Sequence, residues 1–84
     1  MFREQDIEFT PSSHRHDIPS ADAYYAMTHP QWVDVLDGED GDVTRAFYGH
    51  PHPQTSRFIE VFAALKPDGR LVVFHAMDRP DLAN

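Results

Sequence analysis

The sequence has no cysteine among its 84 residues. This absence excludes disulfides, thiolate metal sites and a cysteine nucleophile. Secreted domains of this size more often carry disulfides, so we expect a cytoplasmic protein. The first residues lack the apolar core of a signal peptide, and no apolar run has the length that spans a bilayer. We therefore expect no membrane among its partners.

Basic residues are scarce as well. Seven Lys and Arg side chains stand against fourteen Asp and Glu, which gives a formal net charge of −7 at neutral pH. Proteins that bind nucleic acids usually carry a basic surface, because neutralised phosphates supply most of their affinity. The composition therefore argues against broad non-specific binding and leaves room for a small local basic site. Six histidines are many for this length, and they gain charge as the pH falls below about 6.5.

Aromatic side chains, in contrast, are plentiful. Six Phe, three Tyr and one Trp contribute to a hydrophobic share of 40%. A chain of this length has room for one modest core, which these side chains can fill without disulfides. We therefore expect residues 1–84 to form a single domain, with residues 1–5 and 80–84 frayed at its ends.

The fold is expected to centre on Ser56–Met77. Two apolar runs, Phe58–Leu65 and Leu71–Met77, flank the sequence KPDG at Lys66–Gly69. Pro and Gly in this arrangement are typical of a β-turn. The second run contains consecutive bulky and β-branched residues, which favour a strand buried on both faces. We predict a central β-hairpin that ends at His75.

The first run of this hairpin is ambiguous. Phe58, Val61, Phe62 and Leu65 also occupy the i, i+3, i+4 and i+7 positions of an amphipathic helix, which Pro67 would end. Short apolar runs cannot be assigned by their period alone. We favour the strand, and the helix stays as the alternative.

A short helix is predicted over Ser20–Thr28. Ser20 is a favourable N-cap, the Ala-rich run has high helix propensity, and Pro30 disfavours helix at the residue before it. The helix is too short to be stable alone, so it depends on packing against the sheet. Its expected buried face comprises Ala21, Tyr24, Tyr25 and Thr28.

The remaining strands are predicted from alternation of apolar and polar residues. They cover Ile7–Thr10, Trp32–Leu36 and Val43–His50, and an acidic, Gly-containing turn separates the last two. In chain order the elements are a strand, a helix and four strands. The predicted fold class is therefore α+β, with one short helix packed on a sheet of four or five antiparallel strands.

No metal or cofactor site is predicted. His14/His16 and His50/His52 each have the i, i+2 spacing that places two imidazoles on one strand face, and zinc accepts such ligands. No further ligand is fixed by spacing, so loop histidines are the favoured interpretation. The acidic run Asp37–Asp42 lacks the glutamate that a calcium loop has at its twelfth position. A solvated hairpin turn explains it.

Candidate chemistry lies at the end of the central hairpin. His75 could act as a general acid or base, and Arg79 could hold a phosphate group. The alternative is a half-buried histidine bonded to a backbone carbonyl, with a solvated Arg79, and spacing alone favours it. Arg45 and Arg57 either pair with acids across the sheet, such as Glu60, or line one cationic pocket with Arg79 and His16. Sequence spacing leaves both open.

Several short segments follow the pattern of one family in the right order. The helix entry RHDIPSAD resembles its "[KR]-H-G-[IV]-[SP]-x-E-[ED]", RFIEV resembles "R-L-L-E-V", and the stretch from Arg70 to Arg79 resembles "R-[IL]-x-[IV]-I-x-A-x-x-x-R". Further matches are the helix end at Ala26–Pro30 and the strand at Phe47–Gly49. Together they resemble the BrnT family of small RelE-like ribonuclease toxins from bacterial toxin–antitoxin systems.

The resemblance implies a β-α-β-β-β-β sheet domain in which the ambiguous run is a strand. It also implies metal-independent cleavage of RNA and neutralisation by an antitoxin protein, and a homodimer is a further candidate. By position, His16, Arg57 and Arg79 match recurring family residues, and the residues themselves add His75 and Arg45 as candidate catalytic groups. Asp17 stands where the family usually has Gly. The alternative is a divergent, non-catalytic protein-interaction domain with an acidic surface.

Overall fold

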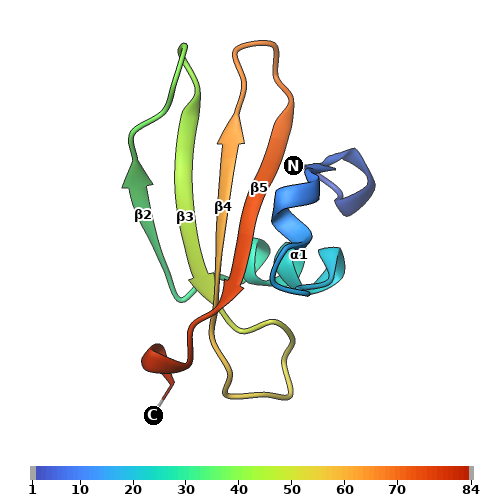
Figure 1. The fold of residues 1–84 in the computed structure, drawn as a ribbon, viewed down its shortest axis with the longest axis vertical. Helices are drawn as coiled ribbons and strands as arrows, with labels where there is room; N and C mark the ends of the chain where they lie inside the picture. Colours follow the sequence, from blue (N-terminus) through green and yellow to red (C-terminus); the bar gives the residue numbers. More distant parts are fainter. Residues whose placement is uncertain (1, 84) are drawn as a thin grey trace.

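The computed structural model describes residues 2–83 and contains one helix and a five-stranded sheet (Figure 1). The predicted α+β fold is therefore confirmed. None of the helices in the described range has the length and apolar character needed to cross a membrane. The elements are η1 Glu4–Asp6, β1 Glu8–Phe9, η2 Pro11–His14, α1 Ser20–Thr28, β2 Trp32–Leu36, β3 Val43–Gly49, β4 Ile59–Leu65, β5 Leu71–Asp78 and η3 Pro80–Leu82.

Both ends of the chain carry short 3-10 turns where fraying was expected. η1 begins inside the expected range 1–5 and extends to Asp6, and η3 lies inside the range 80–84. In each turn, backbone N–H groups donate to carbonyl groups three residues earlier. Met1 and Asn84, which were included in that expectation, lie outside the described residues.

The strand order is β1-β5-β4-β3-β2, and one pairing differs from the expected antiparallel sheet. β2 to β5 form an antiparallel meander, whereas β1 pairs with β5 in parallel. β1 lies beside the start of β5, where Glu8 pairs with Val72 and Phe9 pairs with Val73. β2 begins toward the opposite end of the sheet, because Trp32 is in the row of Tyr48, Glu60 and Met77. The segment that contains η2 and α1 connects these two edges of the sheet.

The ambiguous run is a strand, as favoured. β4 pairs with β3 on one side and β5 on the other, and it is the central strand of the five-stranded sheet. Ile59, Val61 and Ala63 are buried under the helix, and Ala64 is buried on the opposite face. Burial on both faces explains why its apolar residues do not alternate with polar ones. A positive φ of 93° at Gly69 supports the predicted turn to β5.

β5 continues beyond His75, which corrects the predicted end of the hairpin. Ala76, Met77 and Asp78 pair with residues of β4. The register shifts between Phe62 and Ala63, so that β5 carries one extra residue, a β-bulge. Sequence alternation alone does not indicate such an insertion.

α1 has the predicted bounds but presents a different face to the sheet. Ala23 and Ala26 are buried, whereas the expected set is half-buried (Tyr24, Tyr25) or exposed (Ala21, Thr28). The helix approaches β3 so closely that a Cβ on Gly49 would lie 3.3 Å from the carbonyl oxygen of Ala26. Only small residues fit at this distance, so the tyrosines lie beside the contact.

The cap of α1 also differs from the prediction. Pro19 occupies the N-cap position and no side chain caps the helix, so Ser20 is the first helical residue. Proline before the first turn leaves the backbone in the extended conformation required there, with φ −61° and ψ 147°. The entry to the helix is therefore fixed by backbone geometry.

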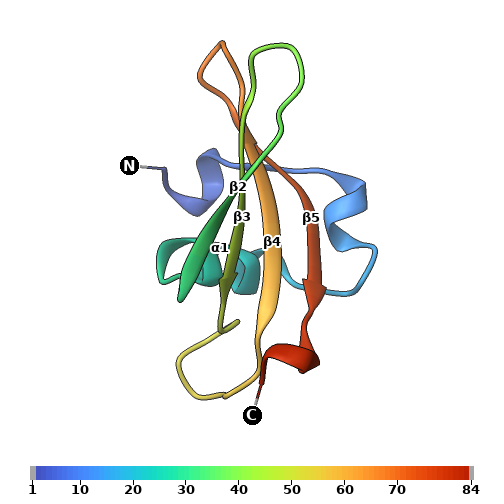
Figure 2. The ribbon, with the colours of Figure 1, turned by 90° about the vertical axis from the view of Figure 1, so that its left-hand side faces the viewer.

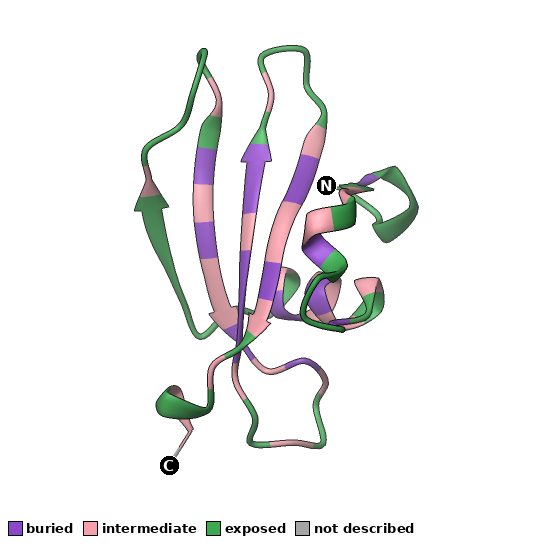
Figure 3. Cartoon of the chain, in the orientation of Figure 1, coloured by how far each residue is buried: buried purple, intermediate pink, exposed green. Residues whose placement is uncertain are grey.

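The sheet has two different faces, seen edge-on in Figure 2. One, the helix-side face, is covered by α1 over β3 and β4 and holds the core. The other, the open face, carries Trp32, Tyr48, Phe62 and His75, which follow from the strand register. In Figure 3 the burial is concentrated in the inner strands, and most of β2 is exposed.

Candidate active site

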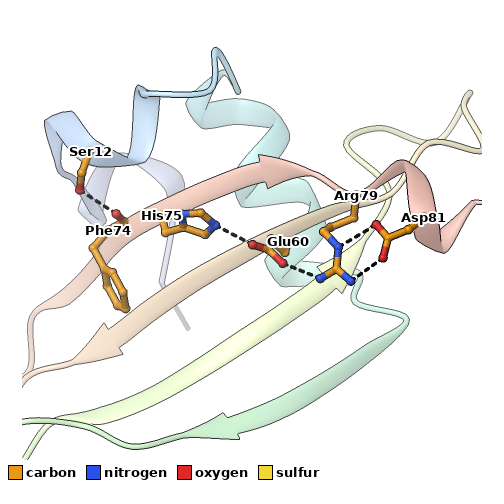
Figure 4. A network of polar contacts seen from close by, with 6 residues as sticks. All are labelled: Ser12, Glu60, Phe74, His75, Arg79 and Asp81. Atoms are coloured by element: carbon orange, nitrogen blue, oxygen red, sulfur yellow. Dashed lines mark hydrogen bonds and ion pairs between the residues drawn. The ribbon is translucent and has the colours of Figure 1, made fainter.

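The open face holds a polar network centred on Glu60 (Figure 4). Glu60 is only 6% exposed, although it belongs to an otherwise apolar strand. Its Oε2 lies 2.6 Å from His75 Nε2, and its Oε1 accepts a hydrogen bond of 2.6 Å from Arg79 Nη1. A carboxylate only accepts hydrogen bonds, so His75 Nε2 must donate. In the neutral imidazole this leaves the lone pair on Nδ1.

Arg79 is held from its other side by Asp81. Nε and Nη2 donate to the two carboxylate oxygens of Asp81 at 2.9 and 2.7 Å. These hydrogen bonds, followed by the one to Glu60, raise the pKa of Arg79 far above its ordinary value. The same guanidinium lowers the pKa of Asp81. Arg79 is permanently charged, and three of its five N–H donors are used within the protein.

The bulge in β5 brings His75 to the open face. Phe62 pairs with His75 while Ala63 pairs with Val73, so Phe74 is the extra residue. Without this insertion, strict alternation from Val73 would turn His75 toward the helix-side face. The imidazole packs on Phe62 with ring centroids 4.5 Å apart, and its side chain is 25% exposed.

A second histidine approaches from the chain after η2. The exposed His16 ring lies edge-on to His75, with centroids 5.7 Å apart and an interplanar angle of 76°. η2 is anchored to β5 because Ser12 Oγ donates to the Phe74 carbonyl at 2.7 Å (Figure 4). The bulge thus both aims His75 and offers a carbonyl that fixes the segment carrying His16.

Arg57 and Arg45 lie apart from this group. Arg57 pairs with Asp78 at 2.6 Å, and Asp78 is in register with Ile59, a residue of the helix-side core. Arg45 also faces the helix side, and its Nη1 donates to the Thr44 carbonyl. Of the two alternatives left open by the sequence, the cationic pocket of four groups is therefore not formed. Arg57 does pair with an acid, but its partner is Asp78, and neither arginine pairs with Glu60. The ends of the hairpin do lie together, because Arg57 bonds Asp78 beside Arg79.

The two histidine pairs that were considered as metal ligands each have a member with another partner. His14 Nδ1 lies 3.4 Å from the Ile18 carbonyl, and His50 Nδ1 lies 2.7 Å from the Arg57 carbonyl. Within residues 2–83, no group of three or more His, Cys, Asp or Glu side chains is arranged to hold a metal ion.

Glu60 is the residue whose role the sequence did not reveal. We considered it only as a partner of Arg45 or Arg57, whereas it bonds His75 and Arg79, 15 and 19 residues away. One signal was present, since a single acid lies within the apolar run of β4. A buried charge requires partners, and the histidine and arginine at the end of the next strand supply them.

The fold and site define an α+β domain with a His–Glu–Arg network on the open face of its sheet. Comparisons of the chain with protein-family models, curated proteins and solved structures found no match. The resemblance to the BrnT family thus depends on the short segments given above.

The pairing of Arg79 with Asp81 leads to a prediction about acid. The folded-state pKa of Asp81 is lowered, so this pair stabilises the protein above the unfolded pKa of about 3.9 and the gain is lost as the pH falls through the folded value. Asp81→Asn should therefore destabilise the protein at pH 7, and the difference from wild type should shrink below about pH 4. Urea unfolding across pH 2–7 measures it. Asp34→Asn, on exposed β2, is the control; a constant difference for Asp81→Asn would contradict the prediction.

Proposed function

We propose that this protein is a metal-independent endoribonuclease in which His75 and His16 carry out acid–base catalysis. The observation that supports this function is the proximity of the two imidazoles. Their ring centroids are 5.7 Å apart, and His75 is hydrogen-bonded to the buried carboxylate of Glu60. Cleavage of RNA by its own 2′-hydroxyl needs one group to remove a proton and another to supply one. Histidine can do both near neutral pH.

In the proposed reaction His75 is the base. Its Nδ1 removes the 2′-hydroxyl proton, the oxygen attacks the adjacent phosphorus, and the bond to the 5′-oxygen breaks. Protonated His16 gives its proton to that leaving oxygen, so the products are a 2′,3′-cyclic phosphate and a 5′-hydroxyl. Glu60 stabilises the imidazolium that forms on His75 through the bond to Nε2. Arg79 positions Glu60. This role of Arg79 differs from the phosphate binding that the sequence suggested for it.

Features of the backbone also support the proposal. Asp17 has φ 62°, in the left-handed region that favours glycine and tolerates aspartate. An aspartate is therefore compatible with the position where the BrnT pattern has Gly. The chain order of one strand, one helix and four strands also agrees with what that resemblance implies. We extend the proposal to a cytoplasmic toxin whose partners are RNA and an antitoxin protein.

RNA cleavage by the purified protein is the direct test. We expect wild type to cut a mixed-sequence single-stranded RNA, with and without EDTA, and to leave 2′,3′-cyclic phosphate ends. His75→Ala and His16→Ala should each slow cleavage by about 10²-fold or more. His52→Ala, in the loop before β4, should cut at the wild-type rate. A substrate with 2′-deoxy sugars should stay intact.

Two results would overturn the proposal. One is intact RNA after incubation with folded wild-type protein at high concentration. The other is cleavage that persists in the double variant of His75 and His16. In cells, regulated expression of wild type should slow growth and degrade total RNA, whereas His75→Ala should do neither. Arg57→Ala, which lies outside the network, should behave as wild type does.

The second candidate function is a non-catalytic protein-interaction domain. The observation that favours it is charge: Arg79 is already paired with two carboxylates, and the chain has a net charge of −7. Such a surface attracts basic proteins more readily than RNA. A folded protein that leaves RNA intact and binds a basic partner supports this function over the first.

A further inference from the structure

Exposed apolar residues gather on one part of the helix-side face. Val33 and Val35 of β2 are 44% and 75% exposed, Val43 of β3 is 46% exposed, and Leu65 of β4 is 37% exposed. The register places all four on the same face, since Val35 and Val33 pair with Arg45 and Phe47, and Val43 pairs with Leu65. Val35, Val43 and Leu65 lie toward the hairpin tips, whereas Val33 lies nearer the start of β2, closer to Gly49 and α1.

This apolar area continues into a groove beside the helix. The groove has a volume of about 290 Å³ and is lined mainly by apolar side chains. Phe47 and Leu71 connect the two parts, because Phe47 pairs with Val33 and Leu71 pairs with Leu65. We call the combined area the apolar surface; its members are Phe2, Tyr24, Met27, Val33, Val35, Val43, Phe47, Leu65 and Leu71.

β2 forms the edge of the sheet next to this surface. It is the last strand in the order and pairs only with β3 among the described strands, so its outer backbone N–H and C=O groups are open to a further strand. Natural edge strands are usually protected by lysine, proline or a bulge. Trp32–Leu36 contains none of these, and its one charged residue, Asp34, faces the opposite side.

The charge of the loop after β2 indicates which kind of partner would bind this edge of the sheet. β2 runs into the loop that carries Asp37, Glu39 and Asp40, all exposed; the neighbouring Asp42 is already paired with Lys66. A second copy of the chain would bring an equal negative charge to this edge, which disfavours a homodimer here. A cationic segment is attracted to it.

We propose that β2 binds an extended segment of a basic partner protein, which adds as a sixth strand. Alternate apolar side chains of the segment cover Val33 and Val35, and lysine or arginine at one end faces the acidic loop. Arg45, in register with Val35, offers a donor to an acceptor on the segment. This inference is independent of RNA cleavage, because the apolar surface and the His75 network lie on opposite faces.

The test uses synthetic peptides and a charge-matched pair of variants. The probes are fluorescent decapeptides that alternate Val with Lys or Thr, in a cationic form and a form with Glu in place of Lys. We expect only the cationic form to bind, with an affinity that falls as salt rises. Val35→Asp places a charge on the apolar surface, and Gln54→Asp adds the same charge at an exposed position of the loop between β3 and β4, outside that surface.

The two variants separate strand addition from simple charge attraction. Attraction alone predicts that both variants bind the cationic peptide more tightly, because each adds a negative charge. Strand addition predicts that Val35→Asp weakens binding by about tenfold or more, whereas Gln54→Asp leaves it equal or slightly stronger. RNA cleavage, where present, should be unchanged in both.

Three results would overturn the inference. The first is no binding of the cationic peptide up to about 1 mM. The second is tighter binding by Val35→Asp. The third is a wild-type dimer in sedimentation that Val35→Asp dissociates, since a second copy would then cover the surface. Circular dichroism of each variant checks that its fold is intact, and Val35 is exposed enough for the substitution to be tolerated.

Discussion

Replacing Ile59 with alanine should lower the free energy of unfolding by about 2–5 kcal/mol. Ile59 is fully buried at the start of β4 and lies among the largest side chains of the core. The substitution removes its apolar contacts and leaves a cavity between the sheet and α1, because the helix is held close to Gly49 and cannot easily move inward. The free energy of unfolding of a native domain is about 5–15 kcal/mol in total, so this loss is a large fraction of the stability.

Urea and thermal unfolding measure this effect. Each kcal/mol should lower Tm by roughly 4–8 °C for a domain of this length. Leu65→Ala is the matched control, since Leu65 is on the same strand and face but is 37% exposed at the far end. Its cost should be about 1 kcal/mol or less. Equal losses in the two variants would show that the helix does not enclose the start of β4 as described.

The central hairpin was predictable because its signals are local. One short stretch contains both the turn at Lys66–Gly69 and the consecutive apolar residues of β5. The helix was predictable for the same reason, because Ser20–Thr28 is followed closely by the proline that ends it. The face of that helix was not predictable. Amphipathic periodicity places the large residues inside, whereas the close approach to Gly49 selects Ala23 and Ala26.

The candidate site was found only in part for a related reason. His75 and Arg79 were candidates because they lie at the end of the predicted hairpin, although spacing alone favoured a structural histidine and a solvated arginine. The bulge at Phe74 decides which face His75 occupies, and alternation cannot show a bulge. Arg45 and Arg57 were grouped with them because they are basic. The register places Arg45 on the helix-side face, and Arg57 pairs with Asp78, which is in register with Ile59 of that face. Glu60 completes the network through contacts distant in sequence, which a single sequence does not display.

Replacing Glu60 tests whether its carboxylate determines which ring nitrogen of His75 carries the proton. Glu60→Ala removes the acceptor of two hydrogen bonds and leaves the half-buried imidazole of His75 without a partner for Nε2. We therefore expect the free energy of unfolding to fall by about 2 kcal/mol. Glu60→Gln is different, because an amide has one acceptor and one donor group. Its oxygen can accept from Arg79 while its NH₂ donates to Nε2 of His75, so the stability should change by less than about 1 kcal/mol.

The glutamine variant should therefore keep the fold and change the tautomer. With Nε2 accepting, the proton of the neutral ring moves to Nδ1, the atom that is proposed to act as the base. Nitrogen-15 NMR of the imidazoles should show Nε2–H in wild type and Nδ1–H in Glu60→Gln, with His52 unchanged as an internal control. If His75 is the base, RNA cleavage should fall about as far in this stable variant as in His75→Ala. Wild-type cleavage by a Glu60→Gln protein with the switched tautomer would remove His75 Nδ1 from the mechanism, because that atom would no longer have a lone pair to accept the proton.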